Sequence, residues 1–158
     1  MTAAKIRAYQ PGDIPRLLRL EAQAFTRDAW DRSIFEWYAA ANPGLFLIAE
    51  VETRLAGYCI ARPTRPGAAD LDSIAVFRRH RRHGIGTILL RAAITRLRRR
   101  GVETLALMVR RDNAEAIAFY QRHGFTRTKT VPNYYEDKAT AWRMTATLKS
   151  RASVPVIA

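Results

Sequence analysis

The sequence predicts one domain of the α/β class, an α+β three-layer fold in which helices cover the faces of a mixed central sheet. Two observations predict this fold. Apolar periodicity gives the element order β-α-α-β-β-β-α-β-α-β-β, with about seven strands and about four helices. The length of 158 residues fits one hydrophobic core. We therefore expect residues 1–149 to form a single domain and residues 150–158 to form a loosely ordered tail.

A strand and two helices are expected in the first part of the chain. Residues 5–9 are predicted to form the strand. Asp13 is expected to cap the first helix and Asp31 the second, which runs through residues 31–42. In the first helix, apolar residues recur at helical spacing and predict one buried face, made of Ile14, Leu17, Leu18, Leu20 and Phe25.

Three strands are expected next, followed by two helices and three further strands. Residues 45–62 are predicted to form two strands joined by a tight turn at Glu52-Thr53-Arg54, and residues 63–69 a surface loop. Gly101 and Gly124 are expected to end helices, because a left-handed residue commonly follows a helix. The later elements are a strand over 70–77, a helix from about 84 to 100, a strand over 102–110, a helix over 113–123 capped by Asn113, and strands over 125–131 and 140–148.

The charge is large and unevenly distributed. The formal net charge is +13, and residues 78–111 hold eleven arginines with one acid, Glu103. A one-sided basic field attracts polyanions, which include nucleic acid and polyphosphate cofactors. No apolar run is long enough to span a membrane, the N-terminus lacks the apolar core of a secretory signal, and the single cysteine, Cys59, excludes an intrachain disulfide. We therefore expect a cytoplasmic protein with no membrane partner.

A basic glycine turn, "RRHRRHGIG", precedes the helix that begins near Gly84. Gly84 and Gly86 leave backbone N–H groups uncovered where a helix begins, and such groups together with the helix dipole can hold a pyrophosphate. Two familiar phosphate motifs fail, because Leu89 stands where a dinucleotide fingerprint needs its third glycine and no G-K-[ST] follows. The alternative is that the glycines only shape a strand-to-helix turn.

Three motifs in register resemble the GNAT-type N-acetyltransferases. The stretch "SIAVFRRHRRHGIGTILLRAAI" is similar to their acetyl-CoA signature, [QR]-x-x-G-x-[GA], here Arg81, Gly84 and Gly86. "VRRDNAEAIAFYQRHGF" is similar to their closing motif. "PNYYED" resembles the double-tyrosine loop of protein N-terminal acetyltransferases, including the ribosomal-protein-alanine type. The resemblance covers about residues 5–148 and implies the GNAT fold, with acetyl-CoA as the acetyl donor.

The resemblance also implies roles for individual residues. Asn113 would bond the pantetheine arm, and Tyr120 would stand beside the cofactor sulfur and protonate the leaving thiolate. For Tyr120 the alternative is a core aromatic on an amphipathic helix. The remaining cofactor-binding positions are backbone groups of Ile74, Ala75 and Val76, and the basic turn of Arg81, Arg82, His83, Gly84, Ile85, Gly86 and Thr87.

Acetyl transfer needs a base that takes the proton of the acceptor amine, and at this position the sequence differs from the resembled family. The ribosomal-protein type carries a glutamate five residues before the asparagine, and Met108 stands at that position. Other relatives of the resembled family carry an acid on the earlier strand, just before its "-AV" end, and Asp72 occupies that position in "DLDSIAV". The resemblance therefore nominates Asp72 as the base. The alternative is that Asp72 is a strand-edge carboxylate paired with an arginine. An α-amino group, with a pKa of about 8, needs less help than a lysine.

The acceptor site is expected to use aromatic residues. Tyr134 and Tyr135 are predicted to wall a peptide groove with Phe25 opposite, and ordinary loop packing is the alternative. Glu136 and Asp137 would attract a cationic acceptor. His80, His83 and His123 lack the spacing of a zinc site, so no metal is expected.

The predicted function is acetyl-CoA-dependent transfer of an acetyl group to an amine of a protein or peptide, with an N-terminal α-amine favoured. Direct attack in a ternary complex is expected, because nothing marks Cys59 as an acyl carrier. Two alternatives are an acetyl-CoA-binding sensor without efficient catalysis, suggested by Met108, and an acetyltransferase for a small-molecule amine. Nucleic acid is disfavoured as a partner, because apolar residues interleave the arginines of the basic helix. A monomer or a homodimer is expected.

Overall fold

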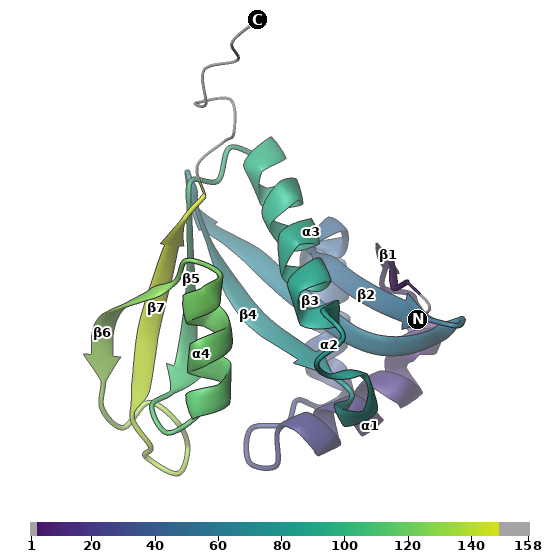
Figure 1. The fold of residues 1–158 in the computed structure, drawn as a ribbon, viewed down its shortest axis with the longest axis horizontal. Helices are drawn as coiled ribbons and strands as arrows, with labels where there is room; N and C mark the ends of the chain where they lie inside the picture. Colours follow the sequence, from purple (N-terminus) through teal and green to yellow (C-terminus); the bar gives the residue numbers. More distant parts are fainter. Residues whose placement is uncertain (1–2, 149–158) are drawn as a thin grey trace, which may run out of the picture. The chain divides into compact units, whose positions relative to one another are not determined.

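A computed structural model describes residues 3–148 and has the predicted order of strands and helices (Figure 1). The strands form one sheet in the order β1-β2-β3-β4-β5-β7-β6. Strands β4 and β5 are parallel, and the pairs β1–β2, β2–β3, β5–β7 and β6–β7 are antiparallel. The mixed sheet with helices confirms the predicted fold class. The strands are β1 (Lys5–Ala8), β2 (Phe46–Val51), β3 (Arg54–Arg65), β4 (Ala68–Val76), β5 (Thr104–Arg110), β6 (Thr126–Val131) and β7 (Ala141–Thr147).

Four α-helices and three short 3-10 helices complete the described part of the chain. The α-helices are α1 (Ile14–Ala24), α2 (Arg32–Ala41), α3 (Ile85–Arg99) and α4 (Ala114–Arg122). The 3-10 helices are η1 (Pro11–Asp13), η2 (Pro43–Leu45) and η3 (Arg78–His80). The predicted tail, residues 150–158, lies outside the described residues. No helix within residues 3–148 combines the length and the apolar character needed to cross a bilayer.

The chain divides into two compact units. The first unit contains the residues up to Arg62 together with Leu71–Arg96, and the second contains Pro63–Asp70 together with the residues from Leu97 onward. A single domain over residues 1–149 therefore stays a prediction.

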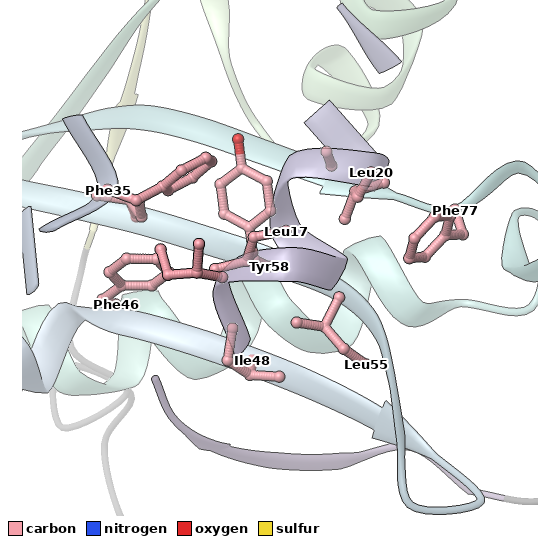
Figure 2. Packing of buried hydrophobic residues seen from close by; sticks show 11 residues of the cluster. Leu17, Leu20, Phe35, Phe46, Ile48, Leu55, Tyr58 and Phe77 are labelled. Carbon is pink, nitrogen blue, oxygen red and sulfur yellow. The ribbon is translucent and has the colours of Figure 1, made fainter. Parts of the chain in front are cut away.

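In the first unit, α1 and α2 pack their apolar faces against β2, β3 and β4. Figure 2 shows this core, in which Tyr58 of β3 stands among aromatic and aliphatic side chains. The Tyr58 ring meets Phe35 of α2 edge-on, with 5.4 Å between centroids. The predicted face of α1 is confirmed for Ile14, Leu17 and Leu20, which are buried. Each large apolar side chain buried in this way stabilises the fold by about 1.5–3 kcal/mol.

Gly57 of β3 allows a close approach inside the first unit. A Cβ placed there would lie 2.7 Å from the carbonyl oxygen of Ala75 in β4. It would also lie 3.2 Å from a methyl carbon of Leu89 in α3. A Cβ at position 57 would therefore collide with the backbone of β4 and crowd the side chain of Leu89, so only glycine fits at this point.

In the second unit, β7 pairs with both β5 and β6. The β5–β7 ladder runs from Thr104 opposite Thr147 to Arg110 opposite Ala141. On its other edge β5 pairs with the first residues of β4, Ala68–Asp70. Helix α4 follows β5, and its N-cap is Asn113, as predicted.

The short-range signals at helix ends are confirmed. The side chain of Asp31 accepts a hydrogen bond from the backbone N–H of Ile34 and caps α2. Gly101 and Gly124, which follow α3 and α4, have φ of +80° and +89°. These are left-handed conformations that glycine adopts without strain.

Two local predictions are wrong. Asp13 makes no side-chain cap bond to α1. Its carboxylate binds Arg7 of β1 at 2.7 Å and accepts from the backbone N–H of Gln10 instead. The surface loop expected over residues 63–69 is mostly strand, because β3 continues to Arg65 and β4 begins at Ala68. The chain reverses at Pro66-Gly67, where Gly67 has φ of +78°.

The close approach at Gly57 yields a stability test. We expect Gly57→Ala to lower the free energy of unfolding by about 1–3 kcal/mol, because the added methyl group must push β3 away from Ala75. Gly12→Ala is the matched control, since a Cβ there meets nothing within 4 Å. Urea denaturation of both variants measures the difference. An equal loss of unfolding free energy in the two variants would show that the close approach at Gly57 is not what destabilises Gly57→Ala.

Candidate active site

In the first unit, the end of β4 continues past its ladder with β5. Phe77 donates its N–H to the carbonyl oxygen of Ala56 in β3 at 2.9 Å, so this edge of the strand end faces β3. Backbone groups alternate between the two edges of a strand, so those of Ile74 and Val76 point to the opposite edge. Ile74–Val76 lie beyond the ladder with β5, which covers Ala68–Asp70. An extended ligand could pair with this edge as an added strand does.

Arg81, the arginine of the predicted signature, folds back onto that edge. Its Nε donates to the carbonyl oxygen of Val76 at 3.1 Å. This bond ties the turn after η3 to the last carbonyl of β4. The N–H of Val76 and the backbone groups of Ile74 are then the ones left for a ligand on this edge.

The turn after Arg81 has the shape of an anion cradle. Arg82 and Gly84 have φ of +65° and +78°, so the backbone turns its N–H groups away from the regular helical direction. A Cβ on Gly84 would meet nothing within 4 Å, which leaves open space beside the turn. The carbonyl of Gly84 accepts from Ile88 at 3.0 Å and begins α3, whose first amides have no partner within the helix. The backbone at Arg82–Thr87 therefore offers amide groups that could bind an anion.

Asp72, the nominated base, is held by an ion pair. Its carboxylate lies 2.8 Å from Nε of Arg62 in β3. The Tyr38 hydroxyl of α2 also bonds Asp72, and burial first, then the charge of Asp72, raises the pKa of Tyr38. These contacts favour the alternative in which Asp72 is a strand carboxylate paired with an arginine. A proton transfer to Asp72 would break up this arrangement.

A buried chain of hydrogen-bonded polar groups near Asp72 was not predicted from the sequence. Glu21 of α1 is 2% exposed, and its Oε1 accepts from the hydroxyl of Tyr58 at 2.6 Å. Its Oε2 accepts from the backbone N–H of Trp30 at 3.0 Å. The Tyr58 hydroxyl, drawn in red in Figure 2, lies 2.6 Å from Oγ of Ser73 in β4. The only sequence signal is that Glu21 follows Leu17 by four residues and so shares the buried face of α1.

This chain links four segments of the first unit: α1, the loop before α2, β3 and β4. Burial raises the pKa of Glu21, while the bonds from Tyr58 and Trp30 lower it. Burial, followed by the charge of Glu21, raises the pKa of Tyr58 well above its ordinary value. Asp72 and Ser73 are consecutive in β4, and Ser73 contacts Tyr58 while Asp72 contacts Arg62 and Tyr38.

Phe25, predicted to face the acceptor, is at the end of α1 in the first unit. Its ring is half-buried and packs against the core around Tyr58. Its backbone N–H bonds the carbonyl of Glu21 at 2.9 Å, so the polar chain and Phe25 belong to one rigid turn.

In the second unit, Asn113 and Tyr120 lie two turns apart on α4. The side-chain oxygen of Asn113 accepts from the backbone N–H of Ala116 at 3.2 Å, which leaves its amide nitrogen for other partners. The Tyr120 ring is half-buried and meets Phe119 and Phe125 edge-on at 5.5 and 5.7 Å. The ring is thus oriented by neighbouring aromatic residues without being fully enclosed.

The double-tyrosine loop of the second unit is braced by Arg110 of β5. Tyr135 and Tyr134 meet edge-on at 4.9 Å, and the guanidinium of Arg110 lies 4.2 Å from the centroid of the Tyr135 ring. Arg110 also binds Asp137 at 3.0 Å, so this carboxylate is engaged within the loop. Tyr134 is 50% exposed and is the tyrosine that a ligand could contact.

The predicted site residues therefore form two groups, one in each unit. The first group joins β4, the cradle, Asp72 and Phe25, and the second joins Asn113, Tyr120 and the double tyrosine. Met108 lies half-buried in β5, in register with Arg143 of β7. Within residues 3–148, no group of three or more His, Cys, Asp or Glu side chains is placed to hold a metal ion.

The buried chain yields a test with two substitutions at one position. We expect Glu21→Ala to lower the free energy of unfolding by about 2–4 kcal/mol, because the Tyr58 hydroxyl and the Trp30 N–H lose their acceptor. Glu21→Gln should lose about 1 kcal/mol or less at pH 7, since its amide can donate to Tyr58 and its oxygen can accept from Trp30. Urea denaturation measures both, and equal losses would contradict the hydrogen-bond account.

The pH dependence of the same pair has a defined sign. The pKa of Glu21 is raised in the folded chain above its ordinary 4.5, so the stability it contributes is fully present below pH 4.5. That contribution is lost as the pH rises through the folded pKa. Since glutamine does not ionise, the stability of the wild type relative to Glu21→Gln should fall as the pH rises above 4.5.

Comparisons with known proteins agree with this geometry. Residues 13–125 match the acetyltransferase (GNAT) family. The N-alpha-acetyltransferase of Sulfurisphaera tokodaii is 29% identical over 156 residues, covering 91% of this chain and 93% of that protein. The ribosomal protein bS18-alanine N-acetyltransferase of Escherichia coli K12 is 33% identical over 133 residues, covering 82% and 86%.

A solved structure agrees as well. Ard1 from Thermoplasma volcanium superposes with a TM-score of 0.89 at 30% identity, covering 94% of this chain and 99% of that one. The family match spans the strand-turn-helix cradle and α4, the elements that carry the predicted motifs. The chain therefore belongs to the acetyltransferase (GNAT) family.

Proposed function

We propose that this acetyltransferase moves the acetyl group of acetyl-CoA to the α-amino group of a protein or peptide N-terminus. The observation that carries the proposal is the cradle at Arg82–Thr87, fixed to the end of β4 by the bond from Arg81 to Val76. The relatives named for N-alpha and ribosomal-protein-alanine acetylation support an α-amine as acceptor.

Acetyl-CoA would be held mainly by backbone groups. The amides of Arg82–Thr87 would bind the pyrophosphate, and the edge of β4 at Ile74 and Val76 would pair with the pantetheine arm. Asn113 would contribute its side-chain amide nitrogen, because its oxygen already caps α4. Backbone binding makes the site depend on loop shape more than on any one side chain.

In the proposed reaction the neutral amine attacks the thioester carbon, so a C–N bond forms and the C–S bond breaks. The Tyr120 hydroxyl would protonate the departing thiolate. The orientation of its ring by Phe119 and Phe125 supports this role. The proton lost by the amine would pass to Asp72 or to water. An α-amine with a pKa of about 8 is partly neutral at pH 7, so a strong base is not required.

Direct transfer in a ternary complex is supported by the burial of Cys59. The thiol lies in β3 with 0% exposure, and burial raises its pKa to about 12. A thiol in that state is not a nucleophile at neutral pH. We therefore propose no acetyl-enzyme intermediate.

The acceptor peptide would lie against Tyr134 and Phe25. Tyr134 is exposed while Tyr135 is fixed by Arg110, so the loop offers one aromatic surface on a braced support. The engagement of Asp137 with Arg110 leaves Glu136 as the carboxylate of the loop that would attract a cationic amine.

A second candidate is a module that binds acetyl-CoA with little catalysis. It is favoured by Met108, which occupies the position of the glutamate in the resembled type. A small-molecule amine as acceptor is the third candidate. Turnover on peptides separates the proposed function from the other two candidates.

We expect Tyr120→Phe to lower kcat at least tenfold with little change in KM for acetyl-CoA, because the thiolate loses its proton donor. Release of CoA thiol with short peptides, whose N-termini are free or blocked, measures the effect. Tyr9→Phe is the control for loss of a tyrosine hydroxyl, since Tyr9 stacks on Phe46 and has no role in the proposed site, and it should keep kcat within about twofold. Turnover on blocked peptides, or full activity of Tyr120→Phe, would contradict the proposal.

The burial of Cys59 yields an independent check on the mechanism. We expect the native thiol to react with a disulfide reagent at least a hundredfold more slowly than in urea, since the thiolate is scarce and enclosed. Cys59→Ala should keep kcat within about twofold. A covalent acetyl adduct trapped on Cys59 during turnover would overturn direct transfer.

A further inference from the structure

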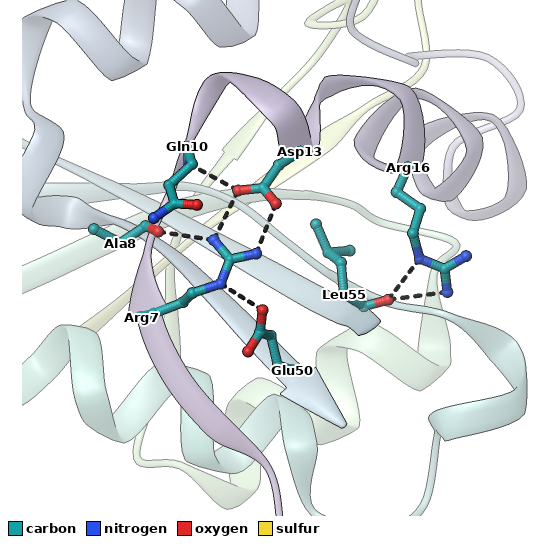
Figure 3. A network of polar contacts seen from close by, with 7 residues as sticks. All are labelled: Arg7, Ala8, Gln10, Asp13, Arg16, Glu50 and Leu55. Atoms are coloured by element: carbon teal, nitrogen blue, oxygen red, sulfur yellow. Dashed lines mark hydrogen bonds and ion pairs between the residues drawn. The ribbon is translucent and has the colours of Figure 1, made fainter. Parts of the chain in front are cut away.

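Two arginines of the first unit differ in how their charge is compensated, and Figure 3 shows both. Arg7 of β1 bonds two carboxylates, those of Glu50 and Asp13, each at 2.7 Å. Arg16 of α1 donates from Nε and Nη2 to the backbone carbonyl of Leu55 at 3.2 and 3.1 Å. A carbonyl orients a guanidinium and satisfies its N–H groups, but it does not neutralise a full charge.

The other contacts of Arg16 place it between turns that carry further arginines. Its guanidinium lies 4.7 Å from the centroid of the Phe77 ring, just before η3. Leu55 follows Arg54 at the start of β3, and Phe77 precedes η3, which contains Arg79. Arg19 lies one turn further along α1. We call Arg16, Arg19, Arg54 and Arg79 the arginine cluster.

The cluster sits on a fixed scaffold. The side chain of Gln23 in α1 accepts from the backbone N–H of Arg78 at 2.7 Å, so η3 is tied to α1. Arg16 ties the start of β3 to the same helix through Leu55. Arg19, Arg54 and Arg79 are exposed at the ends of these segments.

The positive charges act on one another at this surface. Burial, and then the charges of Arg54, Arg79 and Arg19, lower the pKa of Arg16, although an arginine stays charged at neutral pH. Burial first, and then Arg79, Arg16 and His83, lower the pKa of the neighbouring His80, while Glu52 raises it. Such repulsion destabilises the folded chain, and an anion bound across the cluster would relieve it.

We propose that the arginine cluster is a docking surface for the phosphate backbone of nucleic acid. A guanidinium matches a phosphodiester through two parallel N–H bonds, and a nucleic acid presents its charges in a continuous row. The basic side chains are mostly arginine, since all but four of the 27 are of that type. Four arginines on three segments can contact successive phosphates.

This surface differs from the basic helix considered in the sequence analysis. The basic helix belongs to the arginine-rich stretch of residues 78–111, whereas Arg16, Arg19 and Arg54 lie outside that range. None of the cluster's four arginines is among the residues proposed to hold acetyl-CoA, which are Ile74, Val76, the turn from Arg82 to Thr87 and Asn113. The inference therefore does not rest on the proposed acetyl transfer.

The test is binding of a fluorescein-labelled, mixed-sequence single-stranded RNA of about 20 nucleotides, measured by anisotropy over a series of KCl concentrations. We expect Arg54→Gln with Arg79→Gln to weaken binding at least tenfold at about 0.1 M KCl. The slope of log affinity against log salt should fall by about 1.4, because two phosphate contacts are lost. Both residues are exposed, so the variant is expected to fold, and a thermal melt checks this.

The matched control removes the same charge elsewhere. Arg98→Gln with Arg99→Gln, exposed residues at the end of α3, should change RNA affinity less than twofold. Equal weakening by the two double variants would mean that only net charge matters and would overturn the docking surface. Competition by poly-glutamate as strong as by RNA of equal charge would also overturn it, in favour of an acidic protein partner.

The cofactor is the remaining alternative ligand, since acetyl-CoA also carries phosphates. Calorimetric titration with acetyl-CoA separates the two, because it needs no turnover. Docking of nucleic acid predicts the same dissociation constant for acetyl-CoA in the wild type and in the Arg54/Arg79 variant. A selective loss of acetyl-CoA binding, with RNA affinity unchanged, would assign the cluster to the cofactor site and overturn the inference.

Discussion

A carboxylate enclosed by aromatic residues has to be fully hydrogen-bonded, and this constraint organises the first unit. Glu21 meets it by drawing together the Tyr58 hydroxyl and the Trp30 backbone, with Ser73 beyond. The apolar packing of α1 and α2 would allow small rotations of either helix, whereas these bonds allow one register. The position of β4 relative to the turn that carries Phe25 follows from that register, and both are parts of the candidate site.

The charged side chains of the molecule have different structural roles, and their positions in the sequence do not reveal these roles. Arg62 holds the carboxylate of Asp72 and the side chain of Tyr38 in place. Arg110 does the same for Asp137 and Tyr135. The Arg62–Asp72 pair is partly buried and the Arg110–Asp137 pair is more exposed. Pairs that solvent reaches add little stability, so their effect is to fix loops and strand edges. Arg16 uses the same chemistry with a carbonyl in place of the acid, and its charge stays available at the surface.

Much of the fold was predictable because its signals are local. Asp31, Asn113 and the glycines after α3 and α4 act on groups a few residues away, so their patterns in the sequence carry the information. Predictions that needed a distant partner were wrong or missing. Asp13 has the residue type and position of a cap, but Arg7 of β1 takes its carboxylate. Glu21 looks like a solvated helix residue until Tyr58, 37 residues away, is placed beside it.

For the candidate site, the motifs placed the cradle on a strand-turn-helix but not its internal contacts. Nothing in the sequence says that Arg81 returns to Val76, since that bond depends on how η3 folds. The pairing of Asp72 with Arg62 likewise arises from two strands brought together by the sheet. Strand order and turn geometry, which are properties of the whole fold, decide these contacts.

The left-handed backbone of Arg82 has a consequence for how such a site can change over time. Because the turn would hold its ligand with main-chain amides, the backbone conformation at position 82 would matter to the site more than the charge of the side chain. Asparagine or glycine would satisfy the same dihedral angles with less strain. The surface charge around the turn can therefore drift, and new partners can be acquired there, while the shape that recognises the phosphates is inherited unchanged.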